Sequence, residues 1–221
     1  MLQSLCNMPE FKNCNEQHLA TLLSEINSCR ICIDAPAKTP LPHEPRPVLR
    51  ASSTAKIIIC GQAPGKRVHT SGIPFTDPSG LRLRHWMGID NNTFYDVARI
   101  AIIPMGFCFP GLDAKGGDLP PRSECARTWR HPIFNTLAKP DLILLVGFYA
   151  QKWHLGKSCK ANLTQTVAAW RNYMGGPTDY IPLPHPSWRN NAWLKRNQWF
   201  ERDVLPMLRN RVYYILNQTK T

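Results

Sequence analysis

Residues 57–65 read IIICGQAPG, and this stretch decides which fold class the rest of the chain has to fit. Three β-branched isoleucines and a cysteine predict a strand over 56–60. The strand runs directly into a glycine- and proline-rich loop whose one polar side chain is Gln62. A buried strand that ends in such a loop is typical of a ligand site at the edge of a sheet.

On either side of this stretch, the other hydrophobic segments alternate between strand and helix patterns. The run DLILLVG at 141–147 lies between Pro140 and the next helix, and it is typical of a strand buried on both faces. Further strands are predicted at 97–103 and 179–183, and helices at 16–27, 80–88, 122–137, after 147 and at about 190–209. This alternation predicts a three-layer α/β/α fold with a central, mainly parallel four-stranded sheet.

In such folds, ligands bind beyond the carboxyl ends of the strands. The segments expected at that edge are the loops 61–80, 104–121, 147–150 and 184–191. We therefore expect the functional residues in these four loops.

Length and charge restrict the class of protein. A chain of 221 residues is long enough for a sizeable core, and we expect a single domain over 1–221. The formal net charge of +12 favours a polyanionic partner, most simply a nucleic acid. A generally basic protein without such a partner is the alternative.

Residues 1–15 have neither a basic start nor an apolar core, which argues against a signal peptide. The longest apolar run, 142–146, is too short to span a bilayer. We therefore expect a cytoplasmic protein with no membrane partner. Disulfides are rare in that compartment, so the eight cysteines favour metal binding.

The cysteines divide into a spaced set and isolated ones. Cys29 and Cys32 form a C-x-x-C pair after the first helix, and Cys108 and Cys125 lie downstream with sixteen residues between them. The pair is compatible with zinc, an iron–sulfur cluster, a redox dithiol or an incidental arrangement. A thioredoxin-like site does not fit, because the pair lies outside a βαβ unit. Cys60 ends a strand and is expected in the core.

Four elements follow one another in a characteristic order. These are GQAPG (61–65), SGIPFTDPSG (71–80), Cys108 with Cys125, and PLPHPSWRN (182–190). Together with the C-x-x-C pair, they resemble the uracil-DNA glycosylase superfamily, in particular its iron–sulfur-containing families 4 and 5. The resemblance extends from about residue 20 to 205, and its weight lies in the order of the motifs.

The resemblance implies a [4Fe–4S] cluster held by Cys29, Cys32, Cys108 and Cys125. Such a cluster would clamp the N-terminal helix and the C-x-x-C segment (16–32) onto the sheet. Four thiolates also suit zinc, which remains the alternative cofactor.

The resemblance also implies the activity of a monofunctional DNA glycosylase. Such an enzyme hydrolyses the N-glycosidic bond of uracil, or of another deaminated base, after the base has been flipped out of DNA. The partner would be damaged DNA, single- or double-stranded, and we expect a monomer.

The resemblance also implies roles for individual residues at matching positions. His185 would stabilise the departing base, Phe75 would stack on it, and Gln62 would contact the base or its sugar together with the backbone of Gly61, Ala63 and Gly65. Members of the superfamily insert a side chain that follows the H-P-S motif into the space left by the flipped base. The candidates for that loop's DNA contacts are Ser187, Trp188, Arg189 and Asn190.

The chain departs from the superfamily pattern at two points. The carboxylate expected in the first motif is absent, since Gln62 and Ala63 occupy its two usual positions; Asp77 is the nearest substitute, or else a helix N-cap. The asparagine that reads uracil is replaced by Pro104, which predicts relaxed base selectivity. The alternative functions are a catalytically inactive DNA-binding member and a zinc-stapled nucleoside or nucleotide hydrolase.

Overall fold

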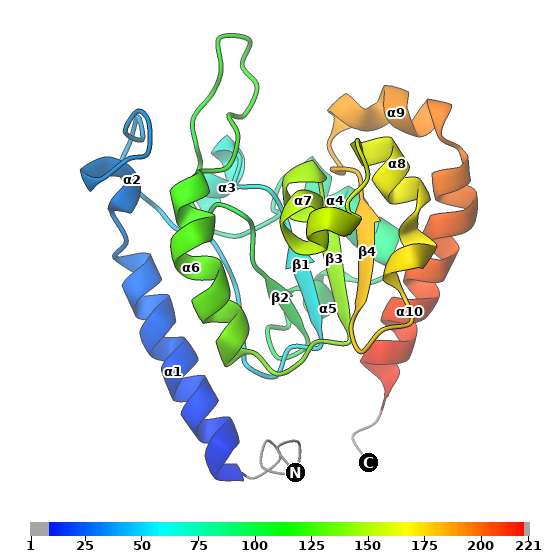
Figure 1. The fold of residues 1–221 in the computed structure, drawn as a ribbon, viewed down its shortest axis with the longest axis horizontal. Coiled ribbons are helices and arrows are strands. Elements are labelled where there is room, and N and C mark those ends of the chain that lie inside the picture. The colour runs from blue at the N-terminus through cyan, green and yellow to red at the C-terminus, as the bar shows by residue number, and fades with distance from the viewer. Residues whose placement is uncertain (1–8, 219–221) are drawn as a thin grey trace.

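The computed structural model describes residues 9–218, so much of the segment 1–15 and Cys6 lie outside it (Figure 1). Its centre is a four-stranded sheet in the order β2-β1-β3-β4, and all three strand pairs are parallel. The strands are β1 (Ile57–Cys60), β2 (Ile100–Ile102), β3 (Leu142–Val146) and β4 (Asp179–Leu183). The predicted fold class is confirmed.

The sheet is buried on both faces because its strands are apolar at every position. Ile57 and Ile59 point into one core cluster, and Ile58 and Cys60 point into the other, as the two-residue period of a strand requires. Helices therefore have to cover both faces, which gives the three layers.

The helices with their bounds are α1 (Pro9–Asn27), α2 (Ile31–Asp34), α3 (Lys66–Ser71), α4 (Pro78–Met87), α5 (Asn91–Tyr95), α6 (Ser123–Thr136), α7 (Phe148–Leu155), α8 (Leu163–Ala168), α9 (Asn191–Arg196) and α10 (Leu205–Asn217). Buried residues of α1, α6 and α7 pack on one face of the sheet, and those of α4, α5, α8 and α10 pack on the other. No helix between residues 9 and 218 has both the length and the apolar composition needed to cross a bilayer.

The helix predicted at 16–27 is present as α1. The predicted apolar face is buried: Leu19, Leu22 and Ile26 are each at most 6% exposed and share a core cluster with α6. The helix begins earlier than predicted, at Pro9.

Two predicted elements differ in the structure. The strand predicted at 97–103 covers only Ile100–Ile102, because α5 and a turn closed by the Asp96 carbonyl occupy the preceding residues. The helix predicted at 190–209 is interrupted: α9 ends at Arg196, and one π-helical turn (Phe200–Val204) leads into α10. Pro206 explains that turn, since it has no N–H to donate to the carbonyl four residues before it.

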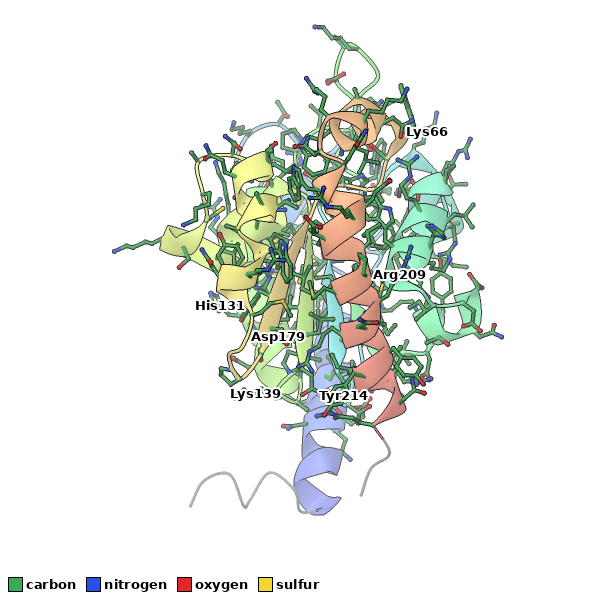
Figure 2. All side chains as sticks on the ribbon, turned by 90° about the vertical axis from the view of Figure 1, so that its right-hand side faces the viewer. Lys66, His131, Lys139, Asp179, Arg209 and Tyr214 are labelled. Atoms are coloured by element: carbon green, nitrogen blue, oxygen red, sulfur yellow. The ribbon has the colours of Figure 1, made fainter. Side chains whose placement is uncertain are left out.

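Strand order fixes where a ligand can bind. The chain leaves β1 for β2 on one side and returns to β3 on the other, so β1 and β3 form a topological switch point. Figure 2 shows Lys66, which follows the loop after β1, at one end of the molecule, and Lys139 and Tyr214 at the opposite end. The four predicted loops lie at the Lys66 end.

One charged side chain is almost completely buried between α6 and the sheet. The guanidinium of Arg130 is 1% exposed and donates to the carbonyls of Ile103 (3.2 Å) and Pro104 (2.9 Å), to the sulfur of Cys60 (3.3 Å) and to Nε2 of His154. Burial, reinforced by the charge of Arg130, lowers the pKa of His154 to about 3. His154 is therefore the neutral acceptor of this cluster.

This pKa predicts an acid-sensitive stability. The unfolded chain binds a proton at His154 near pH 6.5, whereas the folded protein does so only near pH 3. The contribution of His154 to stability is complete above pH 6.5 and is lost as the pH falls towards about 3. Urea unfolding at several pH values should show a weaker decline for His154→Gln, because Gln does not titrate.

The matched control is His85→Gln, since His85 is exposed on α4. It should retain the wild-type decline. An identical pH dependence in the wild type and in His154→Gln would contradict the prediction.

Candidate functional site

A pocket with about 500 Å³ of empty volume lies beyond the carboxyl ends of the strands. The loops after β1, β2 and β4 all contribute to it, as the switch-point rule predicts. Among the predicted site residues, those that line it are Gly61, Gln62, Ala63, Gly65, Phe75, Asp77 and His185. The structure therefore brings together residues that are more than 120 positions apart in the sequence.

Gln62 is positioned by Gly147, the glycine that directly follows the neighbouring strand β3. Gly147 follows β3 with a φ of +89°, and a Cβ at that position would lie 2.9 Å from Cδ of Gln62. The Gln62 side chain thus packs directly on the Gly147 backbone. Backbone N–H groups of Met105 and Gly106 donate to the carbonyls of Gly61 and Gln62 (2.9 Å each), which holds the loop against the chain that follows β2.

Phe75 has a strained backbone. Its φ of +57° is the only positive φ of a non-glycine residue in the part of the chain described, and this region costs an L-residue about 1–2 kcal/mol. The bend brings the ring over Gly61, where a Cβ would lie 3.5 Å from it, and edge-on to Phe94 with 6.0 Å between the ring centroids. The residue is half-buried and its ring forms a wall of the pocket, so it is not an ordinary core phenylalanine.

Asp77 combines the two roles that the sequence left open. Its Oδ1 accepts from the Ser79 hydroxyl (2.7 Å) and from the Gly80 N–H (3.3 Å), which makes it the N-cap of α4. The same side chain lines the pocket. Part of its hydrogen-bonding capacity is therefore used by the helix.

His185 is held between Pro184 and Pro186, and its carbonyl accepts from the side-chain amide of Asn190 at 2.7 Å. Burial lowers the pKa of the imidazole, an effect that the Asp77 carboxylate opposes and the Arg189 charge reinforces. The ring that lines the pocket is therefore neutral near pH 7.

The residues after His185 lie beside the pocket and do not line it. Trp188 is 71% exposed, and the guanidinium carbon of Arg189 lies 5.6 Å from the centroid of its ring. Ser187 and Asn190 brace the loop: the Ser187 carbonyl accepts from Arg82 (3.2 Å), and Asn190 holds the His185 carbonyl. Trp188 and Arg189 are thus the exposed members of this group, although Arg189 also donates to the Gly116 carbonyl at 3.2 Å.

Two further residues of the pocket wall are Pro104 and Asp118. Pro104, which the sequence singled out as a departure, is buried and forms part of the wall after β2. Asp118 also lines the pocket, and the sequence did not single it out. The only signal for it was its place in loop 104–121, since its neighbours GGDLP match no motif.

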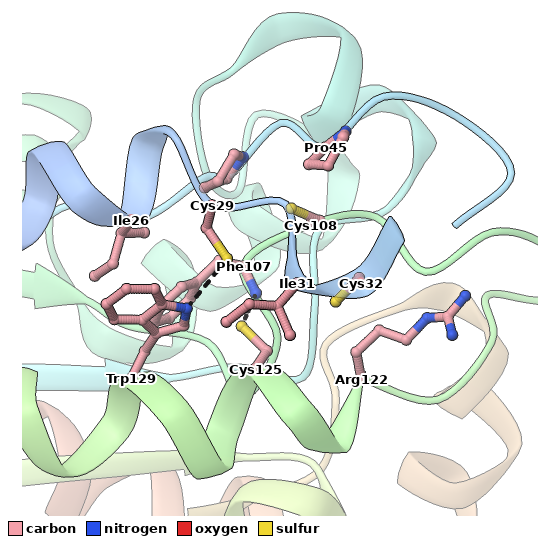
Figure 3. A pocket seen from close by; sticks show the side chains of 11 residues that line it. Ile26, Cys29, Ile31, Cys32, Pro45, Phe107, Cys108, Arg122, Cys125 and Trp129 are labelled. Carbon is pink, nitrogen blue, oxygen red and sulfur yellow. Dashed lines mark hydrogen bonds between the residues drawn. The ribbon is translucent and has the colours of Figure 1, made fainter. Parts of the chain in front are cut away.

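A second pocket, of about 390 Å³, is lined by all four predicted cluster cysteines (Figure 3). The indole N–H of Trp129 donates to Sγ of Cys29, and the backbone N–H of Phe107 donates to Sγ of Cys125, each at 3.3 Å. Among the residues of known placement these cysteines are free thiols, and burial raises the pKa of Cys32 to about 11 and that of Cys108 to about 12.

The four cysteines give this thiol pocket a ligand set that suits a thiolate-bound metal centre. Four thiolates with N–H donors to their sulfurs are the ligand environment of an iron–sulfur cluster. Within residues 9–218, no three His, Cys, Asp or Glu side chains are grouped closely enough to hold a metal ion.

A family comparison agrees with this geometry. The model for the uracil DNA glycosylase superfamily matches residues 49–209, which is more than half of the chain. The chain belongs to this superfamily. Membership supports a glycosylase-like function on DNA, and the matched segment contains every residue named above for the first pocket. It also contains Cys108 and Cys125, whereas Cys29 and Cys32 precede it.

The contact between Gln62 and Gly147 can be tested by unfolding experiments. Gly147→Ala adds a methyl group that crowds Gln62 and imposes an unfavourable φ on alanine. Gly175→Ala imposes a similar φ (+83°) with nothing within 4 Å, so it isolates the backbone cost of about 1–2 kcal/mol. In urea titrations Gly147→Ala should lose more stability than Gly175→Ala.

The excess should disappear when Gln62 is first changed to Ala, because the crowded group is then missing. Equal losses for the two glycine variants in the wild-type background would show that Gln62 does not depend on Gly147.

Proposed function

We propose that this protein is a DNA glycosylase that hydrolyses the N-glycosidic bond of uracil, or of another deaminated base, flipped out of DNA. The observation that carries the proposal is the convergence of Gln62, Phe75 and His185 on one pocket at the switch point of a superfamily fold. A stacking ring, a side-chain amide and a neutral imidazole are the groups that a departing base requires.

The flipped base would lie against the ring of Phe75, whose position is fixed by Gly61 behind it and by Phe94 at its edge. As the bond from C1′ to the base nitrogen breaks, negative charge develops on the base. His185, held rigidly between two prolines and kept neutral by burial, would donate a hydrogen bond to that charge.

The surface around the pocket supports a DNA partner. Lys66 and Arg67 open α3 directly after Gly65, and Arg189 follows His185 on the loop after β4, so cations flank two of the segments that line the pocket. Such groups suit phosphate contacts, which position DNA without reading its sequence. The exposed ring of Trp188 would enter the space that the flipped base leaves.

Pro104 limits base selectivity in this proposal. It is buried in the pocket wall and has neither a side-chain donor nor a backbone N–H. At Pro104 the base can be discriminated only by shape, and discrimination by shape is weaker than discrimination by hydrogen bonds. We therefore infer activity on mispaired uracil and on deaminated purines as well.

We also propose that Cys29, Cys32, Cys108 and Cys125 hold a [4Fe–4S] cluster. The support is their shared pocket and the two N–H groups directed at sulfur. Four thiolates also suit zinc, which remains the alternative cofactor. The cluster would be structural, since it would join the segment after α1 to α6 and hydrolysis requires no electron transfer.

A catalytically inactive DNA-binding protein is the second candidate. The observation in its favour is that Gln62 and Ala63 provide no carboxylate at the first motif. The two candidates differ in whether any base is released.

The deciding measurement is single-turnover base release from duplexes that contain one U·G, U·A, hypoxanthine or xanthine site. We expect release from U·G and from at least one deaminated purine. His185→Ala should reduce the rate by about 10²-fold or more while DNA binding persists, as for the loss of one preorganised donor. His85→Ala, on the exposed side of α4, is the matched control and should behave as wild type.

Base release from none of the four sites by the wild type would favour the inactive candidate. Fast release restricted to uracil, from U·G and U·A alike, would contradict the inference from Pro104.

The cluster proposal predicts a coloured protein with roughly four iron atoms per chain. Cys32→Ser should lose iron, visible absorption and thermal stability together. Cys159→Ser is the matched control, because Cys159 is a half-buried free thiol outside the pocket, and it should retain all three. A colourless wild type that contains one zinc per chain would show that the four cysteines hold zinc and not an iron–sulfur cluster.

A further inference from the structure

Asp118 brings a second carboxylate to the pocket. It belongs to the long segment between β2 and α6, which rises above α6 in Figure 1. Its Oδ2 lies 3.3 Å from the point where a Cβ on Gly65 would be. The carboxylate therefore lies directly over the backbone of the first motif, in the pocket that Gln62, Phe75 and His185 also line.

The surrounding hairpin has a defined structure. Leu112 and Asp118 pair across an antiparallel bridge, and the carboxylate of Asp113 accepts from the backbone N–H groups of Lys115 and Gly117, each at 2.8 Å. Arg189 donates to the Gly116 carbonyl at 3.2 Å, which ties the loop after β4 to the tip of this hairpin. Asp118 is thus held over the pocket by its pairing with Leu112 and by the hydrogen bond from Arg189 to the tip of the hairpin.

Two carboxylates, Asp77 and Asp118, line the pocket, and they differ in how much of their hydrogen-bonding capacity is already used. One oxygen of Asp77 receives two hydrogen bonds as the cap of α4. Asp118 lies on the exposed side of the pocket, and its pKa responds to burial and to charges across space. Asp118 is therefore the freer of the two to contact a sugar or a water molecule.

We propose that Asp118 is the carboxylate that activates water and stabilises the sugar cation in this protein, in place of the acidic residue missing from the first motif. The inference rests on the proposed glycosylase function and identifies a further catalytic residue of that reaction. Neither Gln62 nor Ala63 can accept a proton in this role.

The step balances without a further reactant. The bond between C1′ and the base nitrogen breaks, and its electron pair leaves with the base, which His185 stabilises. The oxygen of a water molecule then bonds to C1′, and the proton of that water passes to the carboxylate of Asp118 and from there to solvent. Until that bond forms, the negative charge of Asp118 stabilises the positive charge on the sugar.

The electrostatic surroundings suit a base. Partial burial raises the pKa of Asp118, and the nearby charges of Asp77 and Asp113 raise it further, whereas Arg189 opposes the shift. A raised pKa makes the carboxylate a better proton acceptor. Bound DNA would cover the pocket mouth and remove more water from this group.

The first test compares variants that remove charge and keep shape. Asp118→Asn should lower single-turnover base release by about 10²-fold or more, within the range for a general base. Asp113→Asn is the matched control: it removes a carboxylate from the same hairpin, keeps an oxygen to accept the two backbone hydrogen bonds, and should release bases at nearly the wild-type rate. Asp118→Ser also removes the carboxylate and should lower base release in the same way, which would show that the loss is not peculiar to Asn.

A pH–rate profile separates chemistry from structure. The wild-type rate should fall on the acid side as Asp118 is protonated, and Asp118→Asn should lack that limb. The charged groups around Asp118 are Asp77, Asp113 and Arg189. Asp77→Asn should therefore move the limb to lower pH, and Arg189→Gln should move it to higher pH.

A binding measurement supplies a readout that needs no turnover. Duplexes with a cationic pyrrolidine abasic analogue and with a neutral tetrahydrofuran analogue differ chiefly in the charge at the sugar. The wild type should prefer the cationic duplex, and Asp118→Asn should lose most of that preference while it binds the neutral duplex normally.

The outcomes distinguish the two proposals. An active wild type with an equally active Asp118→Asn, or an unchanged preference for the cationic duplex, would overturn the role of Asp118 and leave the glycosylase function intact. A wild type that releases no base would refute the glycosylase function, and the role of Asp118 with it.

Discussion

The buried guanidinium of Arg130 connects the two pockets of this protein. A charge in a protein interior is costly unless its donors are paired. The two terminal nitrogens of Arg130 donate to carbonyls and side chains at the ends of β1 and β2 and on α7, whereas its Nε has no partner among the described residues. One acceptor is the carbonyl of Pro104, in the wall of the pocket proposed to bind the base, while Arg130 itself lies on α6, which also carries Cys125. The wall and the thiol pocket are thus fixed relative to each other.

Close approach of backbone to side chain shapes the base pocket. Gln62 packs on Gly147, the Phe75 ring packs on Gly61, and the Phe75 carbonyl would overlap a Cβ on Gly80. The contacts at Gly147 and Gly80 leave no room for a Cβ, so larger residues at these two glycines would displace groups that line the pocket.

The segment that carries Asp118 begins and ends near the thiol pocket. Cys108 precedes it, and Cys125 follows it on α6. A cluster bound by these cysteines would hold both ends of a long loop whose middle lies over the first motif. This arrangement offers a physical reason for a structural cluster in a hydrolytic protein: it restricts the conformations of a loop that the sheet alone would not fix.

The sequence by itself determined the fold class, the edge of the sheet where the pocket lies, and seven of the residues that line it. Those features depend on local patterns: apolar strands such as 142–146, the glycine and proline loop after β1, and motifs with fixed spacing. The tertiary structure decided the rest. It made Asp77 a helix cap as well as a pocket residue, broke the C-terminal helix before Pro206, and brought Asp118 over Gly65. No local pattern encodes the last of these, because it depends on how a hairpin packs across the chain on the loops after β1 and β4.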